Sequence, residues 1–280
     1  MSQGSTRSTV DGAVLRWTEW GAGPPVVLIH GISECGRSWE NQIDQFATAF
    51  RVIALDVRGF GSSAVGDGDG TTRQLADDLW RLVEASDGPF VDAERLGIVG
   101  FSMGGVIAQR FAVDHPELVG ALVVASSSSL VGASGARWFL ERIELARTSG
   151  LGALSELNRQ DAELVAASLR SEARTRYVSC RIEGFADGRG YLNACRAMAG
   201  LRELPLTPEL PRIRCPSLVI TGELDPSCPP RASSIIAEQI PGAEMHILPG
   251  IGHLAHWEAP ELFNETLRSF LLSTMSGSDR

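Results

Sequence analysis

The stretch VGFSMGG, residues Val99 to Gly105, guides the interpretation of the whole chain. It places Ser102 between glycines, after a run of apolar residues and before a helix-compatible segment. A sharp turn from strand to helix forces its central residue into a strained backbone conformation, and the residues two before and two after it must lack a Cβ. Gly100 and Gly104 meet that requirement. The pattern therefore predicts a turn that holds the hydroxyl of Ser102 above the edge of a sheet.

The segments around this turn alternate between strand-like and helical patterns. Six short runs rich in β-branched residues are predicted strands: Pro25–Gly31, Arg51–Gly59, Arg95–Ser102, Ala121–Ser127, Ser217–Asp225 and Glu244–Gly250. Because these runs are apolar almost throughout, we expect strands that are covered on both faces, as in a parallel sheet. Helical patterns lie between them, at residues 38–49, 72–85, 103–114, 231–239 and 260–272. The alternation predicts a doubly wound α/β sheet.

The alternation stops between residues 131 and 210, where the sequence is typical of several helices without a buried strand. This segment has 11 arginines and 10 acidic residues, a charge of +1, whereas the remainder of the chain carries −10. We therefore predict an α/β core formed by residues 1–130 and 211–280. Residues 131–210 are predicted to form a helical cap, inserted over the ends of the strands.

Composition excludes several classes of protein. The formal charge of −9 argues against nucleic acid and against an anionic membrane surface as partners, because both attract clustered cations. All 25 basic residues are arginine. The absence of lysine excludes Schiff-base chemistry, and it excludes the lysine-bearing phosphate loop of many nucleotide hydrolases.

Cysteine usage and the N-terminal sequence bear on the compartment. Five cysteines without a CxxC pair favour reduced thiols over a disulfide framework or a zinc site. The N-terminal residues MSQGSTRSTVDG lack the apolar core of a secretory signal, and no apolar run is long enough for a membrane span. The sequence therefore predicts a cytoplasmic protein.

A serine hydroxyl becomes a strong nucleophile only when a histidine removes its proton and an acid orients that histidine. His253 follows the last predicted strand in a glycine-rich loop, whereas His256 lies nearer to the final helix, where packing or capping is expected. Asp225 leaves the end of a predicted strand between the serine and the histidine. Glu223 competes less well, because its longer side chain precedes the strand exit. Ser102, His253 and Asp225 are the predicted catalytic residues.

Acyl transfer also requires backbone donors for the oxyanion. Met103, next after the serine, offers one N–H. The second donor should come from the loop after the strand PVVLIHG, where Ile32 follows His30 and Gly31. His30 itself is expected to brace this loop by hydrogen bonding.

With serine, acid and histidine in this order, the chain resembles the α/β-hydrolase family from about Val14 to Leu272. The motifs that carry the resemblance are LIHGIS, ALDVRGFGSS, VGFSMGG, VITGELDPSCPP and PGIGHLAHWEAPELFNETLRSFL. The chain is most similar to the cofactor-free branch of 3-oxoadipate enol-lactonases, perhydrolase-type esterases and related carboxylesterases. Relatives with an aspartate nucleophile, the epoxide hydrolases and haloalkane dehalogenases, are disfavoured because the turn carries Ser102.

The resemblance implies an eight-stranded, mostly parallel sheet with helices on both faces and an inserted helical cap. It also implies Ser102 as nucleophile, His253 as base and Asp225 as acid, with the oxyanion held by the amides of Ile32 and Met103. Neither a cofactor nor a metal is expected.

The expected activity is hydrolysis of a carboxylic ester or lactone of a small molecule through an acyl-serine intermediate. Three alternatives remain open: a carbon–carbon bond hydrolase, an acyltransferase, and a small-molecule receptor that retains the triad. We expect the small-molecule substrate to be the partner, and the chain to be a monomer or a homo-oligomer.

The cap contributes candidates for substrate binding. Trp138 and Phe139 either line an apolar pocket or anchor the cap. Three arginines either bind a substrate carboxylate or pair with acids at helical spacing, as Arg137 would with Glu141. These three are Arg137, Arg142 and Arg189.

Overall fold

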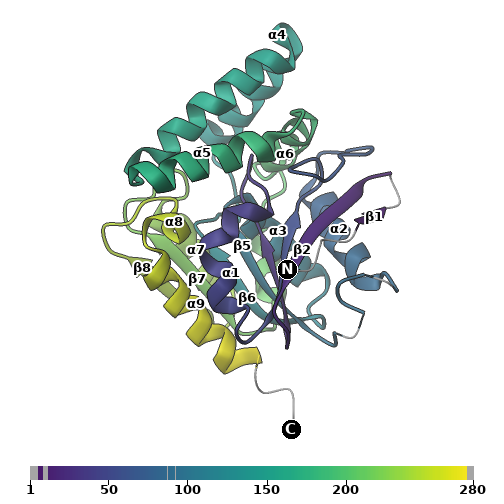
Figure 1. The fold of residues 1–280 in the computed structure, drawn as a ribbon, viewed down its shortest axis with the longest axis vertical. Coiled ribbons are helices and arrows are strands. Elements are labelled where there is room, and N and C mark those ends of the chain that lie inside the picture. The colour runs from purple at the N-terminus through teal and green to yellow at the C-terminus, as the bar shows by residue number, and fades with distance from the viewer. Residues whose placement is uncertain (1–5, 9–11, 87, 92, 276–280) are drawn as a thin grey trace.

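The computed structural model describes residues 6–8, 12–86, 88–91 and 93–275 (Figure 1). The two ends of the predicted core, residues 1–5 and 276–280, lie outside the described residues. The described strands form one sheet in the order β1-β2-β4-β3-β5-β6-β7-β8. Their bounds are β1 (Thr6–Ser8), β2 (Val14–Trp20), β3 (Pro25–Ile29), β4 (Arg51–Asp56), β5 (Leu96–Phe101), β6 (Val119–Ala125), β7 (Ser217–Gly222) and β8 (Glu244–Leu248).

The sheet is mostly parallel, and the predicted α/β class is confirmed. Strand β2 pairs antiparallel with β1 and β4, and every other neighbouring pair is parallel. Seven of the strands span five to seven residues, whereas β1 spans only three. The apolar pattern of the sequence does not predict β1 or β2. Strand β2 carries Arg16 and Glu19 between its apolar residues and buries only part of its surface, so it lacks the continuous apolar pattern.

Helices cover both faces of the sheet. On one face, α2 (Thr72–Glu84), α3 (Met103–Asp114) and α7 (Pro230–Gln239) pack in one apolar cluster with alternate residues of the strands. On the other face, α1 (Glu40–Phe46), α8 (Ala255–Glu258) and α9 (Pro260–Met275) pack in a second cluster. Within β5, Ile98 belongs to the first cluster and Val99 to the second. Strands covered on both faces explain the continuous apolar runs.

Strand β8 departs from the prediction that each run is covered on both faces. Glu244, His246 and Ile247 are exposed, and Leu248 is buried. The reason is position: β8 is the last strand in the sheet order and pairs only with β7. Because an edge strand has solvent on one side, its residues can be exposed even where the sequence is apolar.

The segment between β6 and β7 is helical, as predicted for residues 131–210. It contains α4 (Ala133–Val165), η2 (Ala166–Ser168), α5 (Ser171–Phe185), α6 (Arg189–Gly200) and η3 (Thr207–Arg212). We refer to α4, α5 and α6 as the cap helices. Figure 1 shows them together at the top of the molecule, beyond α1 and α8. Within the described part of the chain, no helix combines the length and apolar character needed to cross a membrane.

Candidate active site

The turn between β5 and α3 has the strained geometry that its glycines predict. Ser102 has φ 51° and ψ −115°, in a region that residues with a side chain rarely adopt. A Cβ on Gly100 would lie 2.2 Å from the carbonyl oxygen of Gly104. A Cβ on Gly104 would lie 2.1 Å from the carbonyl oxygen of Ile29. Both positions therefore exclude any residue but glycine, and the N–H of Ser102 is fixed to the carbonyl of Ala125 at 2.9 Å.

Asp225 and His253 lie in direct contact. The Nδ1 atom of His253 is 2.8 Å from Oδ2 of Asp225, whose side chain is fully buried. The other carboxylate oxygen, Oδ1, accepts the backbone N–H groups of Ser227 and Cys228, each at 2.8 Å. Because a carboxylate accepts, Nδ1 of His253 carries a proton, which makes Nε2 the basic nitrogen of the neutral ring. The imidazole is therefore oriented as a general base requires.

Glu258 fixes the loop that carries His253, and our sequence analysis missed it. Its two carboxylate oxygens accept the N–H of Gly252 at 2.9 Å and the N–H of Leu254 at 3.1 Å. These amides flank His253 on both sides. The contact is made by an acid of α8 that folds back onto the preceding loop. No spacing rule marks such an acid, so no pattern in the sequence predicts it.

Glu223 and His256, the alternatives to Asp225 and His253, have different surroundings. Oε2 of Glu223 accepts the N–H of Gly250 at 2.9 Å, so this acid braces the histidine loop from outside. His256 is fully buried and packs against Phe101, Trp39 and Phe263. Burial and the nearby His253 lower the pKa of His256 to about 3. This histidine is a neutral core residue, in agreement with the packing role expected for it.

Sheet topology brings the three predicted catalytic residues to one edge. Ser102 follows β5, Asp225 follows β7 and His253 follows β8, and the carboxyl ends of parallel strands lie at the same edge of a sheet. The ring of His253 packs on Phe101, the residue before the serine, with 5.0 Å between ring centroids. The imidazole thus lies against the turn that carries Ser102.

Met103 and Ile32, the two predicted oxyanion donors, lie near the place where the first turn of α3 packs against the end of β3. Met103 is the first residue of α3, where an amide has no acceptor within its own helix. Ile32 follows β3, and the carbonyl of Ile29 at the end of that strand is the group that excludes a Cβ from Gly104. The strand end that leads to Ile32 therefore packs against the first turn of α3.

His30 braces the Ile32 loop, as expected. Its Nε2 accepts the N–H of Val57 at 3.0 Å, and its Nδ1 donates to the carbonyl of Gly31 at 2.7 Å. Burial lowers the pKa of His30, which keeps the ring neutral and able to accept at Nε2.

The cap residues singled out in the sequence lie at the start of α4 and α6. The guanidinium of Arg142 stacks 3.2 Å above the Trp138 ring and pairs with Asp161, and Arg189 pairs with Asp187. These contacts favour the pairing alternative for both arginines. For Arg137 and Glu141, which the structure describes, no ion pair is formed, so the expected pairing at this spacing is wrong. Trp138 is 36 % exposed. Phe139 is half-buried and packs against the core.

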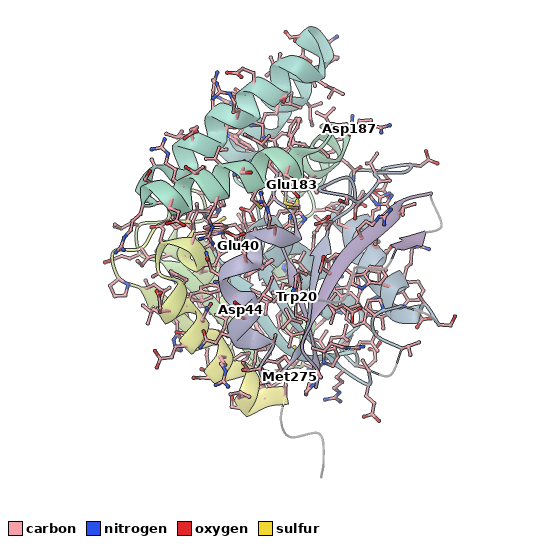
Figure 2. The ribbon with its side chains drawn as sticks, in the orientation of Figure 1. Trp20, Glu40, Asp44, Glu183, Asp187 and Met275 are labelled. Carbon is pink, nitrogen blue, oxygen red and sulfur yellow. The ribbon has the colours of Figure 1, made fainter. Side chains whose placement is uncertain are left out.

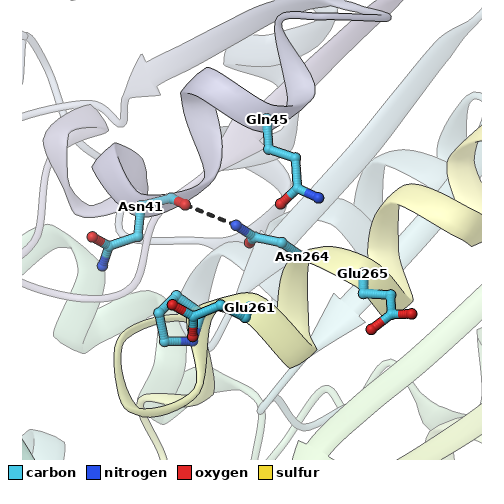
Figure 3. A pocket seen from close by; sticks show the side chains of 6 residues that line it. Asn41, Gln45, Glu261, Asn264 and Glu265 are labelled. Atoms are coloured by element: carbon cyan, nitrogen blue, oxygen red, sulfur yellow. Dashed lines mark hydrogen bonds between the residues drawn. The ribbon is translucent and has the colours of Figure 1, made fainter.

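A polar groove of about 400 Å³ lies elsewhere, between α1 and α9 (Figure 3). Its lining residues are Asn41, Gln45, Pro260, Glu261, Asn264 and Glu265. Across it, Nδ2 of Asn264 donates to the carbonyl of Asn41 at 2.8 Å. No predicted site residue lines this groove.

Comparison with known families identifies the fold family. Residues 24–260 match the model of a family described as the α/β-hydrolase fold. The chain belongs to the α/β-hydrolase family. It is accordingly a hydrolase of this fold, and the resemblance expected from the sequence is confirmed. The structure describes all five cysteines, and each is free.

Individual relatives span almost the whole chain. A protein of Agrobacterium fabrum named as the carbamate hydrolase RutD is 30% identical over 251 residues, which cover 89% of this chain and 93% of the relative. A thermophilic esterase from Thermogutta terrifontis has a TM-score of 0.83 at 25% identity, covering 98% of this chain and 100% of its own. The enol-lactonase from Burkholderia xenovorans has a TM-score of 0.79 at 25% identity, covering 92% and 96%.

Proposed function

We propose that this protein hydrolyses a carboxylic ester or lactone of a small molecule through an acyl-serine intermediate. The observation that carries the proposal is the 2.8 Å contact between Nδ1 of His253 and Oδ2 of Asp225, against the turn that carries Ser102. A buried carboxylate on Nδ1 leaves Nε2 as a base, and a strained serine on the adjacent turn supplies the nucleophile. The solved esterase and enol-lactonase that this chain resembles are named for ester and lactone chemistry, which also supports the proposal.

In the proposed mechanism, Oγ of Ser102 attacks the carbonyl carbon while Nε2 of His253 takes its proton. The amides of Ile32 and Met103 donate to the oxyanion that develops, and Asp225 stabilises the imidazolium. When the C–O bond of the substrate breaks, His253 returns the proton to the leaving oxygen. Water then attacks the acyl-serine with His253 again as base, which releases the acid and restores the serine.

A specific test is labelling by diethyl 4-nitrophenyl phosphate together with turnover of 4-nitrophenyl acetate. We expect one label per chain, on Ser102, and we expect Ser102→Ala to abolish both labelling and turnover. Ser126→Ala is a matched control, because Ser126 is a second serine with positive φ at the end of a neighbouring strand, and its buried hydroxyl has no hydrogen-bond partner among the described residues. Labelling of another residue, or normal turnover in Ser102→Ala, would contradict the mechanism.

Carbamate hydrolysis is a second candidate, favoured by the relative that bears this name. It would use the same residues, with a C–N bond breaking and nitrogen taking the proton from His253. Matched ethyl esters, five- and six-membered lactones and N-alkyl carbamates of the same acyl size would separate the two. We expect kcat/KM to be highest for an ester or lactone. A preference for the carbamate would favour the second candidate.

A further inference from the structure

Glu34 connects the predicted oxyanion loop to the cap. Its side chain is buried, with 1 % exposed. Oε2 accepts the N–H of Gly31 at 3.0 Å, and Oε1 accepts the hydroxyl of Tyr177, on α5, at 2.7 Å. One carboxylate therefore holds both the turn that contains Ile32 and a helix 143 positions further along the chain.

The turn that Glu34 holds is strained. Ser33 has φ 66°, which is unfavourable for a residue with a side chain, and the N–H of Glu34 makes only a long bond, 3.3 Å, to the carbonyl of Gly31. A strained turn keeps its conformation only when other contacts fix it. The bond from the Gly31 N–H to Glu34 is such a contact, one residue away from the Ile32 amide.

Helix α5 packs directly on this turn. A Cβ on Gly184 would lie 2.3 Å from the carbonyl carbon of Glu34, so backbone touches backbone. The carbonyl of Gly184 also accepts the N–H of Gly61 at 3.0 Å. Figure 2 shows Glu40 on α1 and Glu183 on α5 at this junction. Two ion pairs cross it, Arg176–Glu40 at 2.5 Å and Arg37–Glu183 at 3.0 Å.

The hydroxyl of Tyr177 lies between two buried side chains of opposite charge, Glu34 and Arg181. Nη1 of Arg181, one helical turn after Tyr177, lies 3.5 Å from the tyrosine oxygen, so the hydroxyl stands between Arg181 and Glu34. Burial, and the charge of Glu34, raise the pKa of Tyr177 well above its usual value. The phenol therefore remains protonated and donates to Glu34. An uncompensated buried carboxylate would be costly, and Arg181 provides the opposite charge.

We propose that Glu34 is a positioning residue that, with Tyr177, aligns the Ile32 amide with the oxyanion. The cap would then take part in catalysis through the oxyanion loop as well as enclosing the substrate. This inference rests on the proposed function, because the amide needs alignment only if an oxyanion forms. Errors of about 1 Å in a catalytic group can lower the rate by about a hundredfold.

The test measures kcat and KM for 4-nitrophenyl acetate, inhibition by a short alkyl trifluoromethyl ketone, and the infrared carbonyl stretch of the acyl-enzyme. We expect Tyr177→Phe to lower kcat about tenfold and Glu34→Ala about a hundredfold, with KM within about twofold of wild type. The trifluoromethyl ketone, whose adduct is an oxyanion, should bind more weakly by the same factors. The carbonyl stretch should move to higher frequency, because a weaker hydrogen bond polarises the carbonyl less.

Two variants serve as controls. Glu34→Gln keeps an oxygen for the Gly31 N–H, so we expect it to retain most of kcat. Tyr191→Phe removes the hydroxyl of another buried cap tyrosine, whose oxygen accepts from Nε of Arg142 at 3.1 Å. We expect this variant to leave the carbonyl stretch and the ketone affinity unchanged. A merely structural role of the cap would instead make both tyrosine variants behave alike.

The outcomes separate this inference from the proposed function. Wild-type kcat, ketone affinity and carbonyl stretch in folded Tyr177→Phe would overturn the positioning role, even if Ser102→Ala is inactive. If Glu34→Ala does not fold, Tyr177→Phe decides alone. Normal turnover in Ser102→Ala would instead overturn the proposed function, and the positioning role with it.

Discussion

Two histidines three residues apart show how surroundings decide what a side chain does. His253, in the loop after β8, and His256, in α8, both pack on Phe101, with ring centroids 5.0 and 4.3 Å away. His253 donates to Asp225 and keeps 12 % of its side chain exposed. His256 is fully buried, and neither ring nitrogen finds a hydrogen-bond partner in the described structure. Only the first has a carboxylate to orient it and an accessible edge.

The backbone on which each histidine sits explains the difference. The loop before α8 passes over the end of β7 so closely that a Cβ on Gly222 would lie 2.2 Å from the carbonyl of Gly252. This contact places His253 beside Asp225, which follows the same strand. Three residues later the chain is helical, and the helix turns His256 inward against Trp39 and Phe263.

The largest expected effect comes from removing the carboxylate partner of His253. Asp225→Asn keeps the size of the side chain, but its amide favours the wrong imidazole tautomer, so we expect kcat for 4-nitrophenyl acetate to fall by about 10³- to 10⁴-fold. The control is Glu223→Gln, the exposed acid in the same strand-end segment; its one bond, from the Gly250 N–H, can be kept by the amide oxygen, so we expect a change below about threefold. Comparable losses in both variants would contradict the assignment of Asp225.

His256 should make stability depend on pH. Its pKa is about 3 in the folded chain and about 6.5 when exposed, so between these values the unfolded chain binds a proton that the folded chain does not. Stability from this residue is therefore fully present above pH 6.5 and is lost progressively as pH falls toward 3. Between pH 7 and pH 5 the expected loss is about 2 kcal/mol.

Urea unfolding at pH 7, 6 and 5 measures this loss. His256→Phe keeps a flat ring among the aromatic neighbours, and we expect it to reduce the pH dependence by about the same 2 kcal/mol. An equal pH slope in wild type and His256→Phe would show that the buried ring does not resist protonation.

The smallest of these effects should come from loosening the loop around His253. Glu258→Gln retains one acceptor oxygen for the two amides that flank the histidine, and an amide without its acceptor costs about 1 kcal/mol or more. We expect kcat to fall about tenfold with KM nearly unchanged, because the base is misaligned after the substrate binds. Glu261→Gln, an exposed acid at the start of α9, is the control. An unchanged kcat in Glu258→Gln would mean that the glycine contacts alone hold the loop.

Much of the fold was predictable because it depends on local patterns. The runs that became β3 to β8 were recognised from their apolar content, and the turn at Ser102 from two glycines whose absent side chains prevent collisions of 2.1–2.2 Å. Strand β2 was missed because its charged residues interrupt the pattern, and β8 was expected to be covered on both faces although it lies at the edge of the sheet.

The sequence by itself determined the α/β architecture, the helical character of residues 131–210 and the order of serine, acid and histidine. These follow from the periodicity of apolar residues and from residue types at strand ends, which are properties of neighbours in the chain. Only the tertiary structure decided that Glu258 secures the loop of His253 and that Glu34 meets Tyr177 across 143 positions. Contacts between distant segments depend on how the helices pack, and differences of a few tenths of an ångström decide whether a hydrogen bond forms. No local sequence pattern encodes such differences.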